Sequence, residues 1–401
     1  MADMIAINAG ALRDDIVSEV EGSELALMIS LNAFTGYDIS PPYCRILKLN
    51  SSKKDITYSE SYTLPAFKTE CVPGKNVPLT HIESDTNPEN LENGHVLTFN
   101  IRVNLTALRL HFGGADNFQG CEYQKILRDY KSNSPDNVIT FTKPISFKYQ
   151  VGVRIYADSS QTRHDVNRNF DFFVRVKCFD KKKSVIYRNV HTAACESVSH
   201  YVNCHSSKGR AKESMPKFNI LLVGIDSTSN KNFERSLVET YQYLTSKRKK
   251  VFRFEKYAKI ADNTYPNLNA LLTGRFVWEN NPNGDKNYFD NTSLIWREYE
   301  KSGYSSIFLE DEPDFSTYNY LKKGFYKPPS NFYSRPFSLE WQKVMSQLSS
   351  SSSTHCSVYG KNEVEMLLDY SKSLIQEMEK SNHPISILTL SLNIRMAICK
   401  G

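Results

Sequence analysis

The chain has 401 residues, of which 40% are hydrophobic and 23% charged, and its 50 basic and 44 acidic side chains leave a net charge of +6. This length is enough for two domains, and the composition is that of an ordinary soluble globular protein rather than a disordered or fibrous one. So small a positive excess gives no argument for a nucleic-acid partner, and the longest apolar run near the start, Leu25 to Leu31, is too short to span a membrane.

Residues 1–40 are predicted to hold one amphipathic helix around Asp15–Ile29, and we assign them no role. Residues 41–200 form a mostly β domain, because apolar and polar residues alternate over 97–105 and 147–155. Two more strands, Phe172–Cys178 and Ser184–Val190, are expected to form a hairpin. We expect this domain to be a sandwich without a catalytic constellation.

Six of the eight cysteines lie in or near this β domain, and no pair has the C-x-x-C spacing of zinc ribbons or thioredoxin-like proteins. Their even number and wide spacing fit at least two disulfides in an oxidising compartment, although unrelated buried thiols stay open as an alternative. The disulfide candidates are Cys44, Cys71, Cys121, Cys178, Cys195 and Cys204. Glycosylation sequons at Asn50, Asn104 and Asn291 agree with the secretory pathway, whereas no signal-peptide pattern is visible at the start of the chain.

After a polar linker at 201–216, residues 217–401 alternate between strand and helix patterns, which indicates an α/β sheet. The expected strands are Phe218–Ile225, Val251–Phe254, Tyr304–Leu309 and Ile385–Leu390. Helices are expected over 232–246, from Pro266 to Gly274 and over 362–380. A further helix is expected to begin after a cap at Asn291 or Thr292 and to end at Gly303.

The candidate site lies where strands end and helices begin. Asp226 directly follows the near-continuous apolar strand, and Thr264 comes just before a helix amino terminus, which favours an anion. We therefore expect Asp226 and Thr264 to face one another across a cleft. The alternatives are that Asp226 caps a helix or turn and that Thr264 caps the short helix. Glu310 and Asp311 follow another strand and fall on the same edge, with loop solvation or capping as their alternative.

Two runs, Thr264-Tyr265-Pro266-Asn267 and Leu271-Leu272-Thr273-Gly274, together with Asp226, resemble the alkaline phosphatase superfamily, which includes sulfatases and phosphodiesterases. The whole set is closer to a branch of secreted or membrane-anchored invertebrate proteins known as a domain-of-unknown-function family. Its further motifs here are Gly224-Ile225-Asp226-Ser227, Ser302-Gly303-Tyr304, Glu310-Asp311, Lys323-Gly324-Phe325, Tyr333-Ser334-Arg335-Pro336-Phe337, Cys44-Arg45-Ile46 and Cys121-Glu122-Tyr123.

The resemblance implies a metal-dependent hydrolase of small or polymeric phosphate or sulfate esters, built on an alkaline-phosphatase-like parallel sheet. Thr264 matches the nucleophile, Asp226 and Thr264 match metal ligands, zinc is the expected metal, and Asn263, Glu310 and Asp311 are expected at the substrate. A formylglycine-type sulfatase has Cys or Ser followed by x-Pro-x-Arg, whereas Thr264 precedes Tyr265-Pro266-Asn267, so phosphoryl chemistry fits better.

The family's remaining Asp and His ligands are expected after the strand matching Ile385–Leu390, yet no Asp, Glu or His follows His383. We therefore expect the catalytic domain to be partial, with its carboxyl-terminal half missing, and the chain as written to be inactive as a hydrolase. The alternatives are a non-catalytic extracellular binding or structural protein that retains the fold, and a truncated product with neither function.

Overall fold

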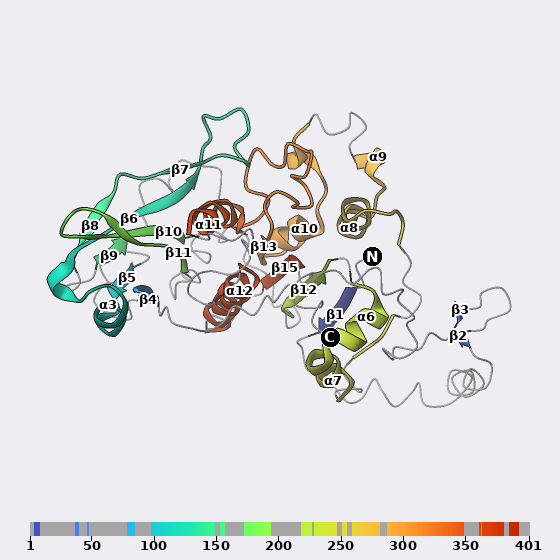
Figure 1. Ribbon diagram of the computed structural model, residues 1–401. Coiled ribbons are helices and arrows are strands. Elements are labelled where there is room, and N and C mark those ends of the chain that lie inside the picture. Colours follow the sequence, from blue (N-terminus) through green and yellow to red (C-terminus); the bar gives the residue numbers. More distant parts are fainter. Residues whose placement is uncertain are drawn as a thin grey trace, which may run out of the picture.

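The computed structural model describes residues 4–8, 37–39, 46–47, 78–84, 98–148, 153–156, 172–193, 218–226, 228–246, 251–254, 259–280, 287–348, 361, 363–380 and 385–392. These residues form a mixed α/β structure with several sheets (Figure 1). Several predictions fall outside the described residues, namely the helix at 15–29, the linker at 201–216, Asn50, and Cys44, Cys71, Cys195 and Cys204. Among the described helices, none combines the length and apolar character needed to cross a membrane.

The β part contains a three-stranded antiparallel sheet in which β5 (Thr98–Val103) lies between β4 (Thr80–Ser84) and β9 (Val153–Tyr156). The alternation predicted over 97–105 holds as far as Val103. Asn104 then ends the strand, because its side chain accepts a hydrogen bond from Ala107 N at 3.0 Å and caps α3 (Leu105–His111).

A second sheet has the order β11-β10-β6-β7, formed by β6 (Phe118–Arg128), β7 (Ile139–Phe141), β10 (Phe172–Asp180) and β11 (Val185–Ala193). The predicted β10–β11 hairpin is confirmed. The single strand predicted over 147–155 is wrong. Its first part is β8 (Ile145–Phe147), which pairs with β6, whereas β9 pairs with β5 in the other sheet. A 3-10 turn (Ala115–Asn117) precedes β6, and β2 (Tyr37–Ile39) pairs with β3 (Ile46–Leu47).

One disulfide joins the second sheet. Cys121 on β6 and Cys178 on β10 are direct cross-strand partners, and both are buried. This is one of the two or more bridges that the sequence predicts, and the other four candidates lie outside the described residues. Oxidation of these two thiols is compatible with a secreted protein.

The α/β part has a five-stranded sheet in the order β1-β12-β15-β13-β14. The strands β12 (Ile220–Ile225), β13 (Ser305–Glu310) and β15 (Ile385–Leu392) correspond to three of the predicted strands, and β12–β15, β15–β13 and β13–β14 are parallel pairs. The outer strands β1 (Met4–Asn8), antiparallel to β12, and β14 (Phe332–Tyr333) were not predicted.

The helices of this part follow the expected order, but two helix predictions and one strand prediction need correction. The helix expected over 232–246 is two helices, α6 (Asn230–Ser236) and α7 (Val238–Ser246), separated at Leu237. The strand expected at Val251–Phe254 is absent, and Phe252 and Phe254 are about 70% exposed, so their apolar character does not mark a buried strand. The cap of α10 (Ile295–Lys301) is Leu294, because Asn291 belongs to the preceding 3-10 turn (Phe289–Asn291).

The remaining helices are α8 (Thr264–Thr273), α9 (Val277–Asn280), α11 (Arg335–Leu348) and α12 (Glu363–Lys380). In Figure 1, α11 and α12 lie between the β part and the α/β sheet. Aromatic residues of α11 and α12 pack on Phe173 of β10: its ring is 5.8 Å from Phe337 and 5.6 Å from Tyr370. The two parts therefore share one hydrophobic core.

His191 of β11 is buried beneath β4, and its Nε2 lies 2.8 Å from Thr80 Oγ1. Burial, with a smaller effect of His81, lowers its pKa from 6.5 to about 4. The folded state therefore resists protonation while the unfolded state accepts it. The resulting stability is fully present above pH 6.5 and is lost as the pH falls through 4, which corresponds to about 3 kcal/mol.

We expect the free energy of unfolding to fall by about 3 kcal/mol more in the wild type than in His191→Gln between pH 7 and pH 3.5. Urea unfolding of both proteins at several pH values measures this difference. The comparison with His191→Gln is needed because burial raises the pKa of Glu310 to about 7. Protonation of Glu310 therefore raises the free energy of unfolding as the pH falls, equally in both proteins. If the free energy of unfolding fell equally with pH in both proteins, His191 would not be the group that destabilises the fold in acid.

Candidate functional site

The structure brings Asp226 and Thr264 into direct contact. Thr264 Oγ1 donates a hydrogen bond of 2.9 Å to Asp226 Oδ1, although 38 residues separate them in sequence. Asp226 follows the last residue of β12, and Thr264 is the first residue of α8. Both residues are partly buried. The end of β12 and the start of α8 thus place the Asp226 carboxylate against the Thr264 hydroxyl. The sequence pattern of a buried strand, a loop and a helix led us to expect that these two residues lie close together.

Neither residue occupies the N-cap position of the helix that follows it. Asn263 is the N-cap residue of α8 and is exposed, and its side chain makes no capping hydrogen bond. Ser229 caps α6 by accepting a hydrogen bond of 3.2 Å from Asn232 N. The helix N-cap positions are therefore occupied by neighbours of Asp226 and Thr264, whereas Asp226 lies in the turn that follows β12, where Thr228 Oγ1 donates to its carbonyl at 3.2 Å. At the other end of α8, Gly274 adopts the left-handed conformation expected of a helix terminator.

Asn267 holds the loop in front of Thr264, a role that the sequence analysis missed. Its Nδ2 donates to the carbonyls of Asn263 at 2.7 Å and Ala261 at 2.6 Å. Its Oδ1 accepts from Ile260 N at 2.7 Å. One side chain therefore fixes three points of the loop that leads into α8. The only signal in the sequence is that an amide side chain follows Thr264 by three positions, within one turn of the same helix.

Tyr265, the residue after Thr264, anchors the start of α8 in an aromatic cluster. Its ring lies 5.9 Å from Phe289 and 5.8 Å from Tyr318 in edge-on geometry. Lys322 Nζ lies 4.2 Å from the centre of the same ring. The cluster belongs to the core beneath β13 and α10. Packing on one side and the Asn267 hydrogen bonds on the other restrict where the Thr264 hydroxyl can lie.

Glu310 and Asp311 lie at the end of β13 and are buried. The Glu310 carboxylate accepts hydrogen bonds from Thr317 N at 2.9 Å and Thr317 Oγ1 at 2.6 Å, so it stabilises the loop that follows the strand. Burial raises its pKa to about 7 despite these hydrogen bonds. A role of these two acids and of Asn263 at a substrate stays a prediction.

Two other motifs converge on Asp136 of the β part. Its carboxylate accepts hydrogen bonds from Phe325 N at 2.9 Å, Tyr333 Oη at 3.1 Å and Asn319 Nδ2 at 2.7 Å, and it forms an ion pair of 3.0 Å with Arg128. Arg335 Nε donates to the Asp136 carbonyl at 2.8 Å. The Lys323-Gly324-Phe325 and Tyr333–Phe337 motifs therefore join the two parts of the chain.

In the part of the chain that the structure describes, few donors for a metal lie near Thr264. Asp226 and Thr264 are two candidate ligand residues, whereas protein zinc sites use three or four protein ligands. Within the described residues, no group of three or more His, Cys, Asp or Glu is placed to hold a metal ion. These donors alone do not fit zinc, and zinc binding stays a prediction.

The chain matches the model of one protein family. Residues 75–390, well over half of the chain, match a family model whose description is protein of unknown function (DUF229). No curated protein and no solved structure matches the chain.

Proposed function

The chain belongs to the DUF229 family, and from this premise we propose that Asp226 and Thr264 are the nucleophilic end of a site that hydrolyses phosphate or sulfate esters. The observation that carries the proposal is the 2.9 Å hydrogen bond from the Thr264 hydroxyl to the Asp226 carboxylate. A nucleophile held by a group that can accept its proton is the arrangement that covalent catalysis requires. The family resemblance of Thr264-Tyr265-Pro266-Asn267 supports the same assignment.

In the proposed reaction the Thr264 oxygen attacks the phosphorus or sulfur atom of the ester. Its proton passes to Asp226, the bond between the phosphorus or sulfur atom and the ester oxygen breaks, and the leaving oxygen takes up a proton to depart as the alcohol. Water then releases phosphate or sulfate and restores the hydroxyl. The amino terminus of α8 carries partial positive charge and favours the anionic group beside Thr264. A divalent cation would add charge neutralisation, and because the described donors are too few to hold one, no step is assigned to it.

Phosphate esters are the favoured substrates. Position 264 is a threonine followed by Tyr265-Pro266-Asn267, whereas formylglycine sulfatases need cysteine or serine followed by x-Pro-x-Arg. A hydroxyl nucleophile therefore acts unmodified, and phosphoryl transfer to a hydroxyl is the simpler chemistry. An extracellular phosphoesterase-like enzyme is the function that the site supports best.

A second candidate is a non-catalytic extracellular protein that keeps the fold for binding or structure. One observation favours it. Asp226 and Thr264 are only two candidate ligand residues among those described, whereas a zinc site has three or four protein ligands. The two candidates differ in one measurable property, which is turnover that depends on Thr264.

We expect any hydrolysis of bis(p-nitrophenyl) phosphate or p-nitrophenyl phosphate by the full chain, with or without added zinc, to depend on Thr264 and to be abolished in Thr264→Ala. Release of p-nitrophenol is the measurement, with p-nitrophenyl sulfate as the test of substrate class. Thr273→Ala is the matched control, because this hydroxyl lies in the same helix and donates to Asn269 O at 2.6 Å. Equal rates in Thr264→Ala and the wild type would refute the proposal, and no turnover in any protein would favour the second candidate.

A further inference from the structure

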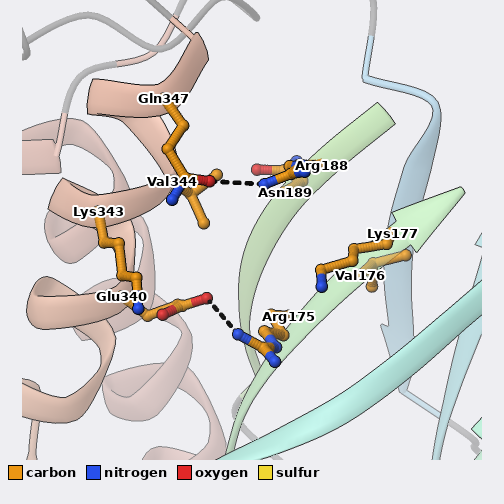
Figure 2. A pocket seen from close by; sticks show the side chains of 9 residues that line it. All are labelled: Arg175, Val176, Lys177, Arg188, Asn189, Glu340, Lys343, Val344 and Gln347. Atoms are coloured by element: carbon orange, nitrogen blue, oxygen red, sulfur yellow. Dashed lines mark hydrogen bonds and ion pairs between the residues drawn. The ribbon is translucent and has the colours of Figure 1, made fainter. Parts of the chain in front are cut away.

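A cleft that Thr264 does not line lies between α11 and the strands β10 and β11 (Figure 2). It has a volume of about 220 Å³. Its polar lining consists of Arg175, Lys177, Arg188, Asn189, Glu340, Lys343 and Gln347, with Val176 and Val344 as the apolar part. Four of these side chains are cationic and one is anionic. The cleft therefore carries an excess of positive charge at a junction between the two parts of the chain.

The two arginines are held in place by neighbouring side chains. Arg175 forms an ion pair of 3.1 Å with Glu340, and its guanidinium also donates to Gln124 Oε1 at 2.8 Å. Arg188 donates to Gln347 Oε1 at 2.5 Å across the cleft. Because Glu340 is almost fully buried, the Arg175–Glu340 pair fixes the floor of the cleft rather than its rim.

The two lysines differ from the arginines. Among the described residues, neither the Lys177 nor the Lys343 ammonium has a hydrogen bond or an ion pair. Lys177 comes from β10 and Lys343 from α11, so they belong to opposite walls. Figure 2 shows Lys177 extending from its strand toward the space beside α11. The cleft therefore has an ammonium group without a hydrogen bond or ion pair on each of its two walls.

Positive charges surround Lys177 closely. Its direct cross-strand partner on β11 is Arg188, and like charges directly opposite each other destabilise a sheet. Its partner on the other side is Glu122 of β6, and Glu340 faces it from α11. Burial, followed by the charges of Arg175 and Arg188, lowers the pKa of Lys177 even though both carboxylates oppose this.

We propose that this cleft binds a tetrahedral oxyanion, the sulfate or phosphate group of an ester or the free anion, between Lys177 and Lys343. Pockets that enclose a whole drug-sized ligand have volumes of about 300–1,000 Å³, so a cleft of about 220 Å³ suits a single charged group with the rest of the ligand in solvent. Charge-assisted hydrogen bonds from ammonium and guanidinium groups are the usual means of holding such an anion. The assignment goes beyond the proposed function, because none of these residues contributes to the Asp226–Thr264 pair.

The test is calorimetric titration of the full chain at constant ionic strength with glucose 6-phosphate, glucose 6-sulfate, inorganic phosphate and inorganic sulfate. We expect saturable binding of at least one oxyanion, with glucose giving none. Lys177→Met should weaken binding about tenfold or more, as should Lys343→Met. Tighter binding of the esters than of the free anions would identify an ester site, and the reverse order a free-anion site.

Lys182→Met is the matched control, because Lys182 is an exposed lysine in the turn between β10 and β11, outside the cleft. It should bind like the wild type. In the Thr264→Ala background, Lys177→Met should still weaken binding about tenfold or more, which separates this site from the catalytic proposal. As a second readout, a bound anion should raise the pKa of Lys177, measured by NMR of its side chain. No saturable binding, or equal weakening in Lys182→Met and Lys177→Met, would overturn the proposal.

Discussion

Replacing Asp136 by alanine is expected to lower the free energy of unfolding by about 3–5 kcal/mol, because removing one partner of a buried ion pair leaves the other charge uncompensated. The side chains of Arg128 and Asp136 are 4% and 0% exposed, so water cannot take over the lost contacts. Asp136→Ala also removes the acceptor for Phe325 N and for Tyr333 Oη. Urea unfolding at pH 7, followed by circular dichroism, measures the loss.

Asp116→Ala is the matched control for this prediction. Asp116 is an exposed aspartate of the same β part, and substitutions at such positions change stability by no more than about 0.5 kcal/mol. Gly324→Ala should resemble Asp136→Ala. Gly324 has a φ of +70°, and an added Cβ would overlap the Asp136 carboxylate and the Asn319 amide. A loss below about 1 kcal/mol in Asp136→Ala would show that the network does not join the two parts.

The Asp136 network explains why motifs without obvious chemistry accompany the Asp226–Thr264 pair. Arg335 donates to the carbonyls of Asp136 and Pro313 at 2.8 Å each and to Asn137 Oδ1 at 2.6 Å. It thereby connects the β part, the loop after β13 and the start of α11. The conformation of the loop that follows Glu310 thus depends on Asp136 and Asn137 of the β part, through Arg335. Motif residues of this chain serve the joint between its two parts as well as the candidate site.

The local parts of the fold could be predicted from the sequence. Strand β12, helix α8 with Gly274 at its end, and helix α12 follow from apolar periodicity and from glycine and proline positions. The convergence of Asp226 and Thr264 followed from the same reasoning, because both lie where a parallel strand ends or a helix begins. Local rules sufficed there, since each residue is placed by its own element.

Features that depend on distant contacts could not be predicted. Asp136 appears in the sequence as an ordinary loop acid, and its burial depends on Arg128, Phe325 and Tyr333 closing around it. Helix α11 was missed because its first turn was treated as a motif, although its apolar face packs on the β part. The alternation over 147–155 predicted a single strand, but the chain uses its two halves in different sheets.

Replacing Asp226 by asparagine is expected to lower turnover of a phosphate ester by about 10²–10⁴-fold, the usual contribution of a positioned proton acceptor. Asparagine keeps the size of the side chain and an oxygen that can accept the hydrogen bond from Thr264 Oγ1. It cannot accept the proton that leaves when the hydroxyl attacks. The loss should therefore appear in kcat, with little change in the free energy of unfolding.

Asp262→Asn separates this effect from a general loss of negative charge near the nucleophile. Asp262 is an exposed carboxylate two residues before Thr264, and it pairs with Lys259 rather than with the hydroxyl. Its variant should retain wild-type turnover. Asp226→Asn combined with Thr264→Ala should be no slower than Thr264→Ala alone, because residues that act as one unit do not contribute additively. If Asp226→Asn and Asp262→Asn were equally active, the carboxylate would not be the proton acceptor, and the hydrogen bond at 2.9 Å would only orient the hydroxyl.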